Sequence, residues 1–398
     1  MTQSSEANEK VFKIKILGRM LEHLGVQMYK KRNTAIAELV ANAWDAGASK
    51  VHITLPPENT YSRDESHIVI EDNGSGMDVE SIQDKYMVVG RNRRKDGELE
   101  FEIENAENIE AEVSDKSEAR KVMGRKGIGK LAGFGIATEM TLQTWVHKTT
   151  TIFTMRLNDL KLKENEYKDI NIKYENADSE PEEAKTEDGH GTRIILSKLK
   201  HKSPISIQSL KESLSRRFSR TVRGQMKIYV NDEPIGEPAL TYKYAFPEDP
   251  NKVFEEHILS DGNKILYQWA LTDKPIHQTE MRGFTILVRG KTAQAPNFFF
   301  DVEGTATGQH GTKYLVGTIE ADYLDEGVED ESDYISTDRQ EIDWETDEMR
   351  PLYEWGQRLV RNTLYKNGEL AAQKFEDDVL AHDDIKQRIE RLGKATGV

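Results

Sequence analysis

The stretch that decides the fold is GRKGIGKLAGFGIA, residues 124–137, which is rich in glycine and carries two lysines. Glycine has no Cβ, so its backbone N–H groups can approach an anion closely, and phosphate is the anion that such loops commonly bind. The stretch therefore predicts a phosphate-binding loop.

Two known phosphate-binding motifs come close to this stretch, and its context excludes both. A G-x-x-x-x-G-K loop needs Ser or Thr where the chain has Leu131, and a relaxed dinucleotide motif would use Gly127, Gly129 and Ala132. Both motifs follow directly on an apolar strand. The preceding residues, 105–123, are charged and lack a strand pattern. The loop must therefore work with partners elsewhere in the chain.

Composition limits the class of protein. The chain has 398 residues, enough for two or three domains, of which 36% are hydrophobic and 31% charged. The absence of cysteine excludes disulfides, cysteine metal sites and thiol nucleophiles. No apolar run approaches the roughly 18 residues of a membrane span, and the N-terminus lacks a signal-peptide pattern. We therefore expect a cytoplasmic protein with no membrane partner.

The net charge of −15 argues against a wholly basic nucleic-acid binder, but one segment reverses the sign. Residues 198–227 contain nine basic side chains and the single acid Glu212. This segment is either the solvated face of a helix or a surface for an anionic partner such as DNA. Its basic residues are Lys198, Lys200, Lys202, Lys211, Arg216, Arg217, Arg220, Arg223 and Lys227.

The order of the expected elements indicates an α+β fold. Helical spacing at 11–25 and 33–48 precedes strand patterns at 50–55 and 67–74, and more strand patterns follow the glycine-rich stretch. This order favours helices on one mainly antiparallel sheet. A second set of strand patterns begins near residue 225, and the chain is mostly helical from residue 344. We therefore expect three parts, at 1–225, 226–343 and 344–398.

Three polar side chains share one face of the helix expected at 33–48. Glu38, Asn42 and Asp45 are spaced i, i+4 and i+7, while apolar residues supply the other faces. Carboxylate and amide oxygens in a line suit a metal ion that also binds phosphate. The alternative is an ordinary exposed polar stripe.

A further carboxylate lies where the strand expected at 67–74 ends. Asp72 enters a turn with Gly74 and Gly76, where it could accept a hydrogen bond from an exocyclic amine. The alternative is a plain surface turn, because Asp-Asn-Gly is common in turns. Further on, Thr192 follows a glycine at the start of another strand pattern.

Together, these four stretches resemble the sequence boxes of the GHKL ATPase superfamily, which includes gyrase, heat-shock chaperones, histidine kinases and MutL. ELVANAWDAGA (38–48) looks like the N box, DNGSGM (72–77) the D-x-G-x-G box, GRKGIGKLAGF (124–134) the second glycine box and GTRIIL (191–196) the Gly-Thr box. The resemblance covers about residues 15–200. It implies a Bergerat fold, a sandwich of helices on a mainly antiparallel sheet, with an ATP lid at about 80–130.

The resemblance implies ATP and Mg²⁺ as ligands and gives each matching residue a role. Glu38 would be the general base that positions the attacking water, and Asn42 would complete the Mg²⁺ coordination. Asp72 would accept from the adenine amino group. Gly76 and Met77 would shape the base pocket.

Other matching residues would lie against the phosphates or support the base site. Backbone N–H groups of Gly127 and Gly129 would cradle the β- and γ-phosphates, and Lys130 is a candidate phosphate contact. Thr192 would support Asp72 through a water. The remaining residues expected at the nucleotide are Asp45, Gly74, Lys126 and Ile128.

The subclass follows from what surrounds these boxes. A histidine kinase needs a phosphoacceptor histidine on an upstream helical hairpin, and the chain before the N box has only His23 and no room for it. Residues 226–343 instead resemble a transducer domain that reaches back to the γ-phosphate. Arg339, in DYISTDRQEIDWE, matches a chaperone middle-domain arginine, and Lys313, in GTKYLVG, is the rival. Either could instead form a surface salt bridge.

Two functions remain open from the sequence. One is a slow ATP-operated conformational switch that acts on a protein client, with ATP-dependent homodimerisation, in a multi-protein system such as antiviral defence. The alternative is a DNA-associated clamp or loading factor of the MutL or MORC kind, with residues 198–227 on the DNA phosphates. The presence of Glu38 argues against a module that binds ATP without hydrolysing it.

Overall fold

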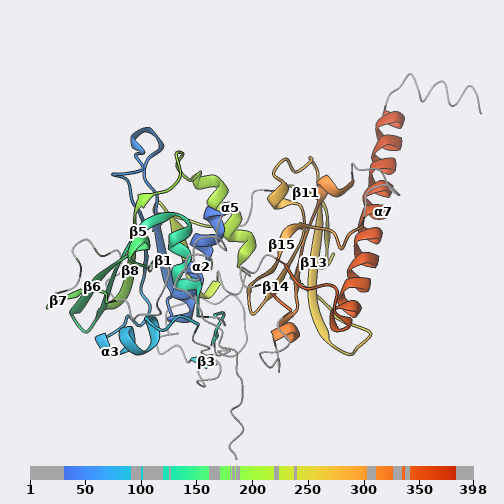
Figure 1. Ribbon diagram of the computed structural model, residues 1–398. Helices are drawn as coiled ribbons and strands as arrows, with labels where there is room; N and C mark the ends of the chain where they lie inside the picture. The colour runs from blue at the N-terminus through green and yellow to red at the C-terminus, as the bar shows by residue number, and fades with distance from the viewer. Residues whose placement is uncertain are drawn as a thin grey trace, which may run out of the picture.

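A computed structural model describes residues 31–90, 100–101, 120–124, 127–160, 171–179, 181, 184, 189–218, 224–236, 240–302, 311–325, 334–336 and 341–381. Its strands form two main sheets, each with its own hydrophobic core (Figure 1). The predicted α+β fold, with helices on a mainly antiparallel sheet, is confirmed. The helix expected at 11–25 and much of the lid expected at about 80–130 lie outside the described residues.

Eight strands form the first sheet: β1 (Lys50–Thr54), β2 (Ile68–Asp72), β5 (Ala137–Val146), β6 (Thr149–Arg156), β7 (Tyr174–Ala177), β8 (His190–Leu199), β9 (Lys227–Val230) and β10 (Glu233–Pro234). Their order is β10-β9-β1-β2-β8-β5-β6-β7. Neighbours are antiparallel except β1 and β9, which run parallel. The register sets Asp72 at the end of β2 opposite Thr192 of β8, and Thr144 of β5 opposite Thr192.

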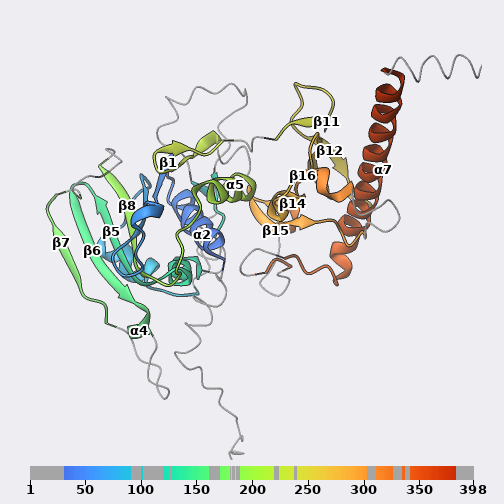
Figure 2. The same cartoon turned by 90° about the horizontal axis from the view of Figure 1, so that it is seen from above.

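Helices cover one face of the first sheet, as Figure 2 shows. They are α2 (Arg32–Asp45), α5 (Ile207–Arg217) and the 3-10 helix η5 (Gly129–Gly135). Alanine-rich α2 has strong helix propensity, and its Ile36 and Leu39 share one core with Met140 and Leu142 of β5. The side chain of Ser206 caps α5 by accepting from the backbone N–H of Ser209.

Short elements complete the first part of the chain. They are η2 (Glu58–Thr60), α3 (Val79–Ser81), the π-helical turn η3 (Ile82–Tyr86), α4 (Leu157–Leu160) and a two-stranded ribbon of β3 (Glu100–Phe101) and β4 (Arg120–Lys121). The turn η3 packs Ile82 into the core beside α2 and η5. This packing places the segment that follows the D-x-G-x-G stretch near the glycine-rich stretch.

The second sheet contains β11 (Tyr242–Phe246), β12 (Glu255–Ile258), β13 (Lys264–Thr272), β14 (Gly283–Val288), β15 (Lys291–Phe298) and β16 (Leu315–Glu320). Its main order is β11-β13-β16-β14-β15, with β12 paired to β13. Only β14 and β16 run parallel among these pairs of described strands. Short 3-10 turns connect the strands: η6 (Thr279–Met281), η8 (Gly311–Tyr314), η9 (Asp322–Asp325) and, before the last helix, η10 (Asp347–Met349).

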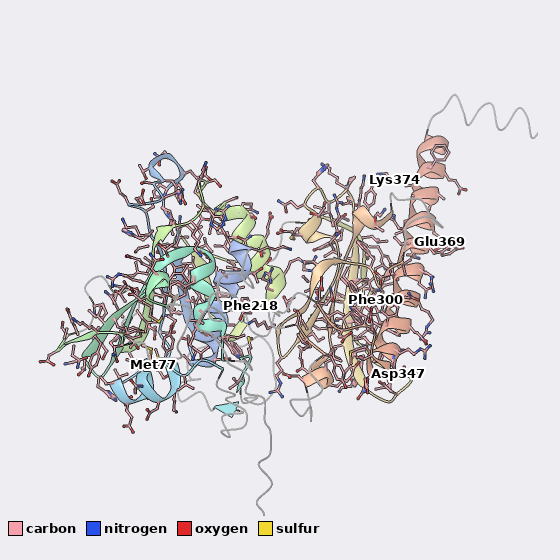
Figure 3. All side chains as sticks on the ribbon, viewed as in Figure 1. Met77, Phe218, Phe300, Asp347, Glu369 and Lys374 are labelled. Atoms are coloured by element: carbon pink, nitrogen blue, oxygen red, sulfur yellow. The ribbon has the colours of Figure 1, made fainter. Side chains whose placement is uncertain are left out.

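The long helix α7 (Arg350–Ala381) packs along the second sheet (Figure 1). Its Leu352 and Val360 are fully buried in the second core. Phe300, labelled in Figure 3, belongs to the same core, and an added Cβ at Gly356 of α7 would lie 2.3 Å from its ring. Glycine at 356 therefore lets the helix approach the aromatic cluster. No helix in the described ranges is long and apolar enough to cross a membrane.

Two boundaries differ from those expected from the sequence. The first sheet does not end near residue 225, because β9 and β10 pair with it through the parallel contact between β9 and β1. The change of sheet therefore falls after Pro234. At the other end, the residues of α7 share their core with the second sheet, so the expected separate part at 344–398 joins the second sheet over its described length.

Candidate functional site

The first cluster of predicted residues meets at the start of η5. Glu38 of α2 is only 8% exposed, and Asn42 lies one turn further along the same helix. A Cβ added to Gly129 would lie 3.1 Å from Oε2 of Glu38 and 3.6 Å from Oδ1 of Asn42. The bare backbone of the glycine-rich stretch therefore lies against the acid and the amide.

Asp45, at the end of α2, has a different task from the one expected. Its Oδ1 accepts from the backbone N–H of Met123 at 2.7 Å, and its Oδ2 accepts from that of Gly124 at 2.8 Å. An added Cβ on Gly124 would lie 2.5 Å from Oδ2. Both oxygens are thus committed to the entry of the glycine-rich stretch, and Asp45 anchors this stretch to α2.

The second cluster surrounds Asp72 at the end of β2. Its side chain is 6% exposed, and its Oδ1 accepts from the backbone N–H of Gly74 at 2.8 Å. No described residue donates a hydrogen bond to its Oδ2. Burial raises the pKa of Asp72 to about 7. This effect outweighs the lowering of the pKa by the hydrogen bond from Gly74. A buried carboxyl with an open acceptor oxygen is suited to a polar ligand group.

Two threonines connect this carboxyl to the turn that follows it. The Thr144 hydroxyl donates to Gly191 O at 3.1 Å, lies 3.3 Å from the Thr192 hydroxyl, and accepts from the backbone N–H of Met77 at 2.8 Å. Thr192 is the cross-strand neighbour of Asp72. The strand ends of β2, β5 and β8 therefore hold Asp72, Thr192 and Met77 in one place.

Glycine is required at one point of this turn. Gly76 has φ of +65°, and a Cβ there would lie 2.2 Å from Trp145 O. At Gly74, two residues earlier in the same turn, an added Cβ would lie 2.7 Å from the Cβ of Ala46. The turn of the D-x-G-x-G stretch thus packs between the end of α2 and the end of β5.

Lys130 lies on the lid side of the loop. Its Nζ donates to Tyr86 O and Val88 O, each at 2.6 Å, at the end of η3. The ammonium therefore fastens the glycine-rich stretch to the lid segment, where the sequence had suggested a phosphate contact. Gly127 adopts φ of +63° and Ile128 is buried. Lys126 lies outside the described residues.

The sequence did not predict the residue of the second sheet that reaches this site. Nζ of Lys291, the first residue of β15, lies 2.8 Å from Oε1 of Glu38, and both side chains are nearly buried. A hairpin turn delivers this lysine: Arg289 and Gly290 have φ of +52° and +74°. A lysine directly after Arg-Gly, following the largely apolar strand GFTILV, was the available signal.

Residues of η9 hold the hairpin that carries Lys291. Asp322 accepts from the backbone N–H of Arg289 at 2.6 Å. Asp325, 3% exposed, pairs through Oδ2 with Nε of Arg289 at 2.9 Å. This buried ion pair fixes the turn, and so it fixes where β15 begins.

Of the two transducer residues expected from the sequence, the structure describes only Lys313, and no ion pair joins it to Glu38 among the described residues. Lys313 lies exposed in η8. Arg339 lies outside the described residues, between two segments joined by the antiparallel bridge of Ile335 and Ile342. Gln294 of β15 accepts from the backbone N–H of Ile342 at 3.0 Å, which ties this second hairpin to the strand of Lys291.

The basic segment at 198–227 does not form a continuous exposed surface over its described residues. Arg216 is 9% exposed and donates to groups of the second sheet, while Arg217 donates to Thr34 of α2. Nζ of Lys200 donates to Phe134 O, and Lys211 pairs with Glu233. Arg216 therefore does not face DNA, because its guanidinium is buried against the second sheet, whereas Arg217 is half-buried and donates to Ser213 and Thr34. Arg220 and Arg223 lie outside the described residues.

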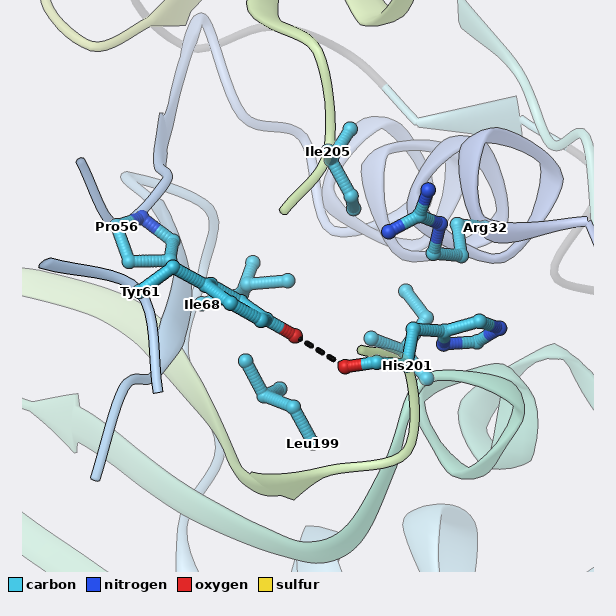
Figure 4. Close-up of a pocket in the computed structure, with 8 residues that line it drawn as sticks. Arg32, Pro56, Tyr61, Ile68, Leu199, His201 and Ile205 are labelled. Atoms are coloured by element: carbon cyan, nitrogen blue, oxygen red, sulfur yellow. Dashed lines mark hydrogen bonds between the residues drawn. The ribbon is translucent and has the colours of Figure 1, made fainter. Parts of the chain in front are cut away.

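A small pocket lies at the opposite end of α2 from Asp45 (Figure 4). Tyr61 donates to His201 O at 2.7 Å, and Arg32 donates to Ser203 O at 2.6 Å. These two hydrogen bonds hold residues 201–203 at the pocket. Burial, with nearby positive charges, lowers the pKa of His201. Ile68 and Ile205 make much of its wall apolar. This pocket is separate from the cluster around Glu38 and Asp72.

The residues around Glu38 and Asp72 fit ATP and a magnesium ion. Asn42 offers an amide oxygen and Glu38 a carboxylate, which are ligand types that Mg²⁺ accepts. The position of Gly129 leaves no Cβ between these oxygens and the loop backbone. Asp72 offers a buried acceptor for an amino group. The donor set therefore matches a nucleotide with its metal.

This arrangement is accompanied by a sequence similarity to a known family. Residues 29–192 match the family described as "Histidine kinase-, DNA gyrase B-, and HSP90-like ATPase". Three of the four sequence boxes fall within this range, and the fourth, at 191–196, begins at its end. Residues 29–192 are therefore similar to a GHKL-type ATP-binding domain.

The chain is also similar to a protein named "Putative type II restriction enzyme HgiDII" from Herpetosiphon aurantiacus. The two are 30% identical over 346 residues, which cover 81% of this chain and 50% of the relative. The chain therefore spans about half the length of the curated relative that it matches. An alignment of this length extends beyond the ATPase domain and includes part of the second sheet.

Proposed function

We propose that this protein is a Mg²⁺-dependent ATPase that uses slow hydrolysis to switch the contact between its two sheets. The observation that carries the proposal is the ion pair between Glu38 and Lys291, because it brings a cation of the second sheet to the proposed catalytic base. A switch needs such a connection: the second sheet can respond to the nucleotide only through a group that reaches its site.

The residues of the first sheet and its helices have separate tasks in this proposal. Glu38 orients a water and takes its proton, and the oxygen of Asn42 helps hold Mg²⁺. The bound metal neutralises charge on the phosphates. Backbone N–H groups of Gly127 and Gly129 donate to phosphate oxygens. Asp72 accepts from the adenine amine, with Thr192 supporting it.

Three cations of the second part of the chain are candidates for reading the γ-phosphate. Lys291 is favoured, since its ammonium is already at Glu38. Arg339 remains a proposal that is supported by the packing of its flanking residues on β15, where Trp344 donates to Gln294 at 3.1 Å. Lys313 remains the rival of Arg339. Each of these cations would stabilise the negative charge that develops during phosphoryl transfer.

The test is phosphate release from ATP, measured with Mg²⁺ and with the metal chelated. We expect slow turnover that requires Mg²⁺. The mass of the protein, measured with and without a non-hydrolysable ATP analogue, tests the proposed ATP-dependent homodimer. Absence of ATP binding at millimolar nucleotide would refute the proposal.

We further propose that the client of the switch is a partner protein in a cytoplasmic defence system. The similarity to a protein named as a type II restriction enzyme supports the defence setting, and the relative's additional length offers a place for a second activity. ATPase rates that rise on addition of the protein encoded beside it would support this client.

The name of the relative also keeps DNA as a second candidate partner, in a MutL-like or MORC-like clamp. The burial of Arg216 weakens the surface expected at 198–227 but leaves Lys202 and Lys227 exposed. DNA binding through phosphates should fall steeply with salt, because each neutralised phosphate releases counterions. No DNA affinity at about 50 mM salt, with or without ATP analogue, would exclude this candidate and favour the protein client.

A further inference from the structure

Three consecutive residues at the end of α5, Arg216–Phe218, join the two sheets, and we call them the junction segment. The first of them, Arg216, is almost fully buried. Its Nη1 donates to Met281 O at 2.8 Å, and its Nη2 donates to Gly283 O at 3.2 Å and to Oγ1 of Thr285 at 2.6 Å. All three acceptors belong to η6 and β14 of the second sheet. Arg216 therefore clamps α5 onto that sheet.

The second residue of the junction segment reaches the helix of the catalytic base. Nη2 of Arg217 donates to Oγ1 of Thr34 at 2.9 Å. Thr34 precedes Glu38 by four residues, so both lie on the same face of α2. In the other direction, Oγ1 of Thr292 in β15 donates to Arg217 O at 3.2 Å. Arg217 therefore contacts both the helix of Glu38 and the strand of Lys291.

The third residue of the junction segment pairs with Lys291 itself. Phe218, labelled in Figure 3, forms an antiparallel bridge with Lys291 and is 1% exposed. The backbone of the lysine is thus held by the first part of the chain, while its side chain reaches Glu38. The three residues together contact α2 at Thr34, one turn before Glu38, and β15 at Lys291.

The hydrogen bonds of buried Arg216 depend on how the two sheets are placed relative to each other. No carboxylate within the described ranges pairs with its guanidinium, which is satisfied by two carbonyls and a hydroxyl. Burial lowers its pKa to about 10, which still leaves it charged near neutral pH. A buried charge without an ionic partner is stable only while its hydrogen bonds are complete. A small separation of the sheets would remove them together and admit water.

We propose that Arg216 and Arg217 are positioning residues that set the Glu38–Lys291 pair, so that the junction segment couples ATP turnover to the contact between the sheets. This inference rests on the proposed ATPase function. Neither arginine touches the nucleotide in this account. Arg216 acts through the second sheet, which carries Lys291, and Arg217 acts through Thr34, one turn before Glu38 on α2.

The test compares Arg216→Gln with Arg282→Gln as a matched control. Arg282 also donates to two backbone carbonyls, Ile276 O and His277 O, but both belong to its own side of the junction. Arg216→Gln should lower kcat by about 10- to 100-fold, the size expected for a small misplacement of catalytic groups. Its KM for ATP should change less than about threefold, because Arg216 makes no contact with ATP and so should not alter the binding of the substrate itself. Arg282→Gln should keep kcat within about twofold.

A double variant separates positioning from general loss of structure. If Arg216 acts through Lys291, the Arg216→Gln, Lys291→Met double variant should have the kcat of Lys291→Met alone. Arg216→Lys should recover part of the activity, because an ammonium can still donate to some of the three acceptors. The proposal would be overturned if the fold-losses in kcat of the two single variants multiply in the double variant. It would also be overturned if Arg216→Gln and Arg282→Gln lose kcat equally.

A second readout does not depend on ATPase activity. The chain has no cysteine, so spin labels can be attached specifically through Glu58→Cys and Ile258→Cys, which are exposed positions of the two parts. Arg216→Gln should broaden the distance distribution between the labels, and Arg282→Gln should leave it unchanged. An unchanged distribution in Arg216→Gln would overturn the clamp even if ATP is hydrolysed. An inactive wild type with a broadened Arg216→Gln distribution would instead refute only the ATPase function.

Discussion

Replacing Lys291 with methionine should cost stability and ATP hydrolysis together. The ammonium lies 2.8 Å from Glu38, and both side chains are nearly buried. At this distance the gross attraction is about 6 kcal/mol with an effective dielectric constant near 20. Much of it offsets the cost of burying two charges, but removing one partner leaves the other charge buried alone. Such a removal costs about 3–5 kcal/mol in buried pairs.

The free energy of unfolding from urea denaturation should therefore fall by about 3 kcal/mol in Lys291→Met. A double variant that also carries Glu38→Gln should be less destabilised than the sum of the single variants, because no unpaired charge remains. Steady-state phosphate release should fall by about 100-fold or more in Lys291→Met, as with other charge-stabilising cations.

Lys313→Met is the matched control for this prediction, because Lys313 is an exposed lysine of the same part of the chain. Its stability should stay within about 0.5 kcal/mol of the wild type. Normal hydrolysis in Lys291→Met combined with lost hydrolysis in Lys313→Met would refute our assignment and make Lys313 the transducer lysine. Strict additivity of Lys291→Met and Glu38→Gln would show that the ion pair does not exist in solution.

Further predictions concern three residues at the nucleotide site. Asp72→Asn should weaken ATP binding, measured by calorimetry, by roughly 1.5–3 kcal/mol, since a charge-assisted hydrogen bond is lost. Burial raises the pKa of Asp72 to about 7, so ATP affinity should rise as pH increases through 7. The stability contribution of this group should fall as the pH rises from about 3.8 to about 7, and Asp72→Asn should remove both trends. Gly76→Ala should strongly impair folding or ATP binding, because φ is +65° and Trp145 O would lie 2.2 Å from the new Cβ. Asp45→Asn should loosen Gly124, seen as faster hydrogen exchange of its N–H, while Asp45→Asn that exchanges like the wild type would contradict the anchor.

Much of the nucleotide site could be predicted because each piece is local in sequence. The spacing of Glu38 and Asn42 follows from helical periodicity, and the turn after Asp72 follows from its glycines. What sequence periodicity does not specify is which distant strands pair. The register of β2, β5 and β8 decides that Thr144, which sequence reasoning missed, connects Thr192 to Met77.

The contacts between the two sheets were the least predictable part of the structure. A run of basic residues indicates only that the segment is charged. It does not show whether its arginines face solvent or a neighbouring sheet. Arg216 is buried because the carbonyls of η6 and β14 satisfy it, and these are backbone groups without a sequence signature. Lys291 was missed for a related reason: its partner Glu38 is remote in the chain, and only the packing of β15 beside α5 brings them together.

Glu38 is proposed as the base of an ATP-hydrolysing site, and comparing binding with hydrolysis tests this role. Phosphate release and ATP binding are measured side by side for the wild type and for Glu38→Gln, in saturating ATP with Mg²⁺. We predict that the variant binds ATP within a few-fold of the wild type, while kcat falls by about 10²–10⁴, the usual size of a general-base effect. A Glu38→Gln protein that hydrolyses ATP at the wild-type rate would contradict the account.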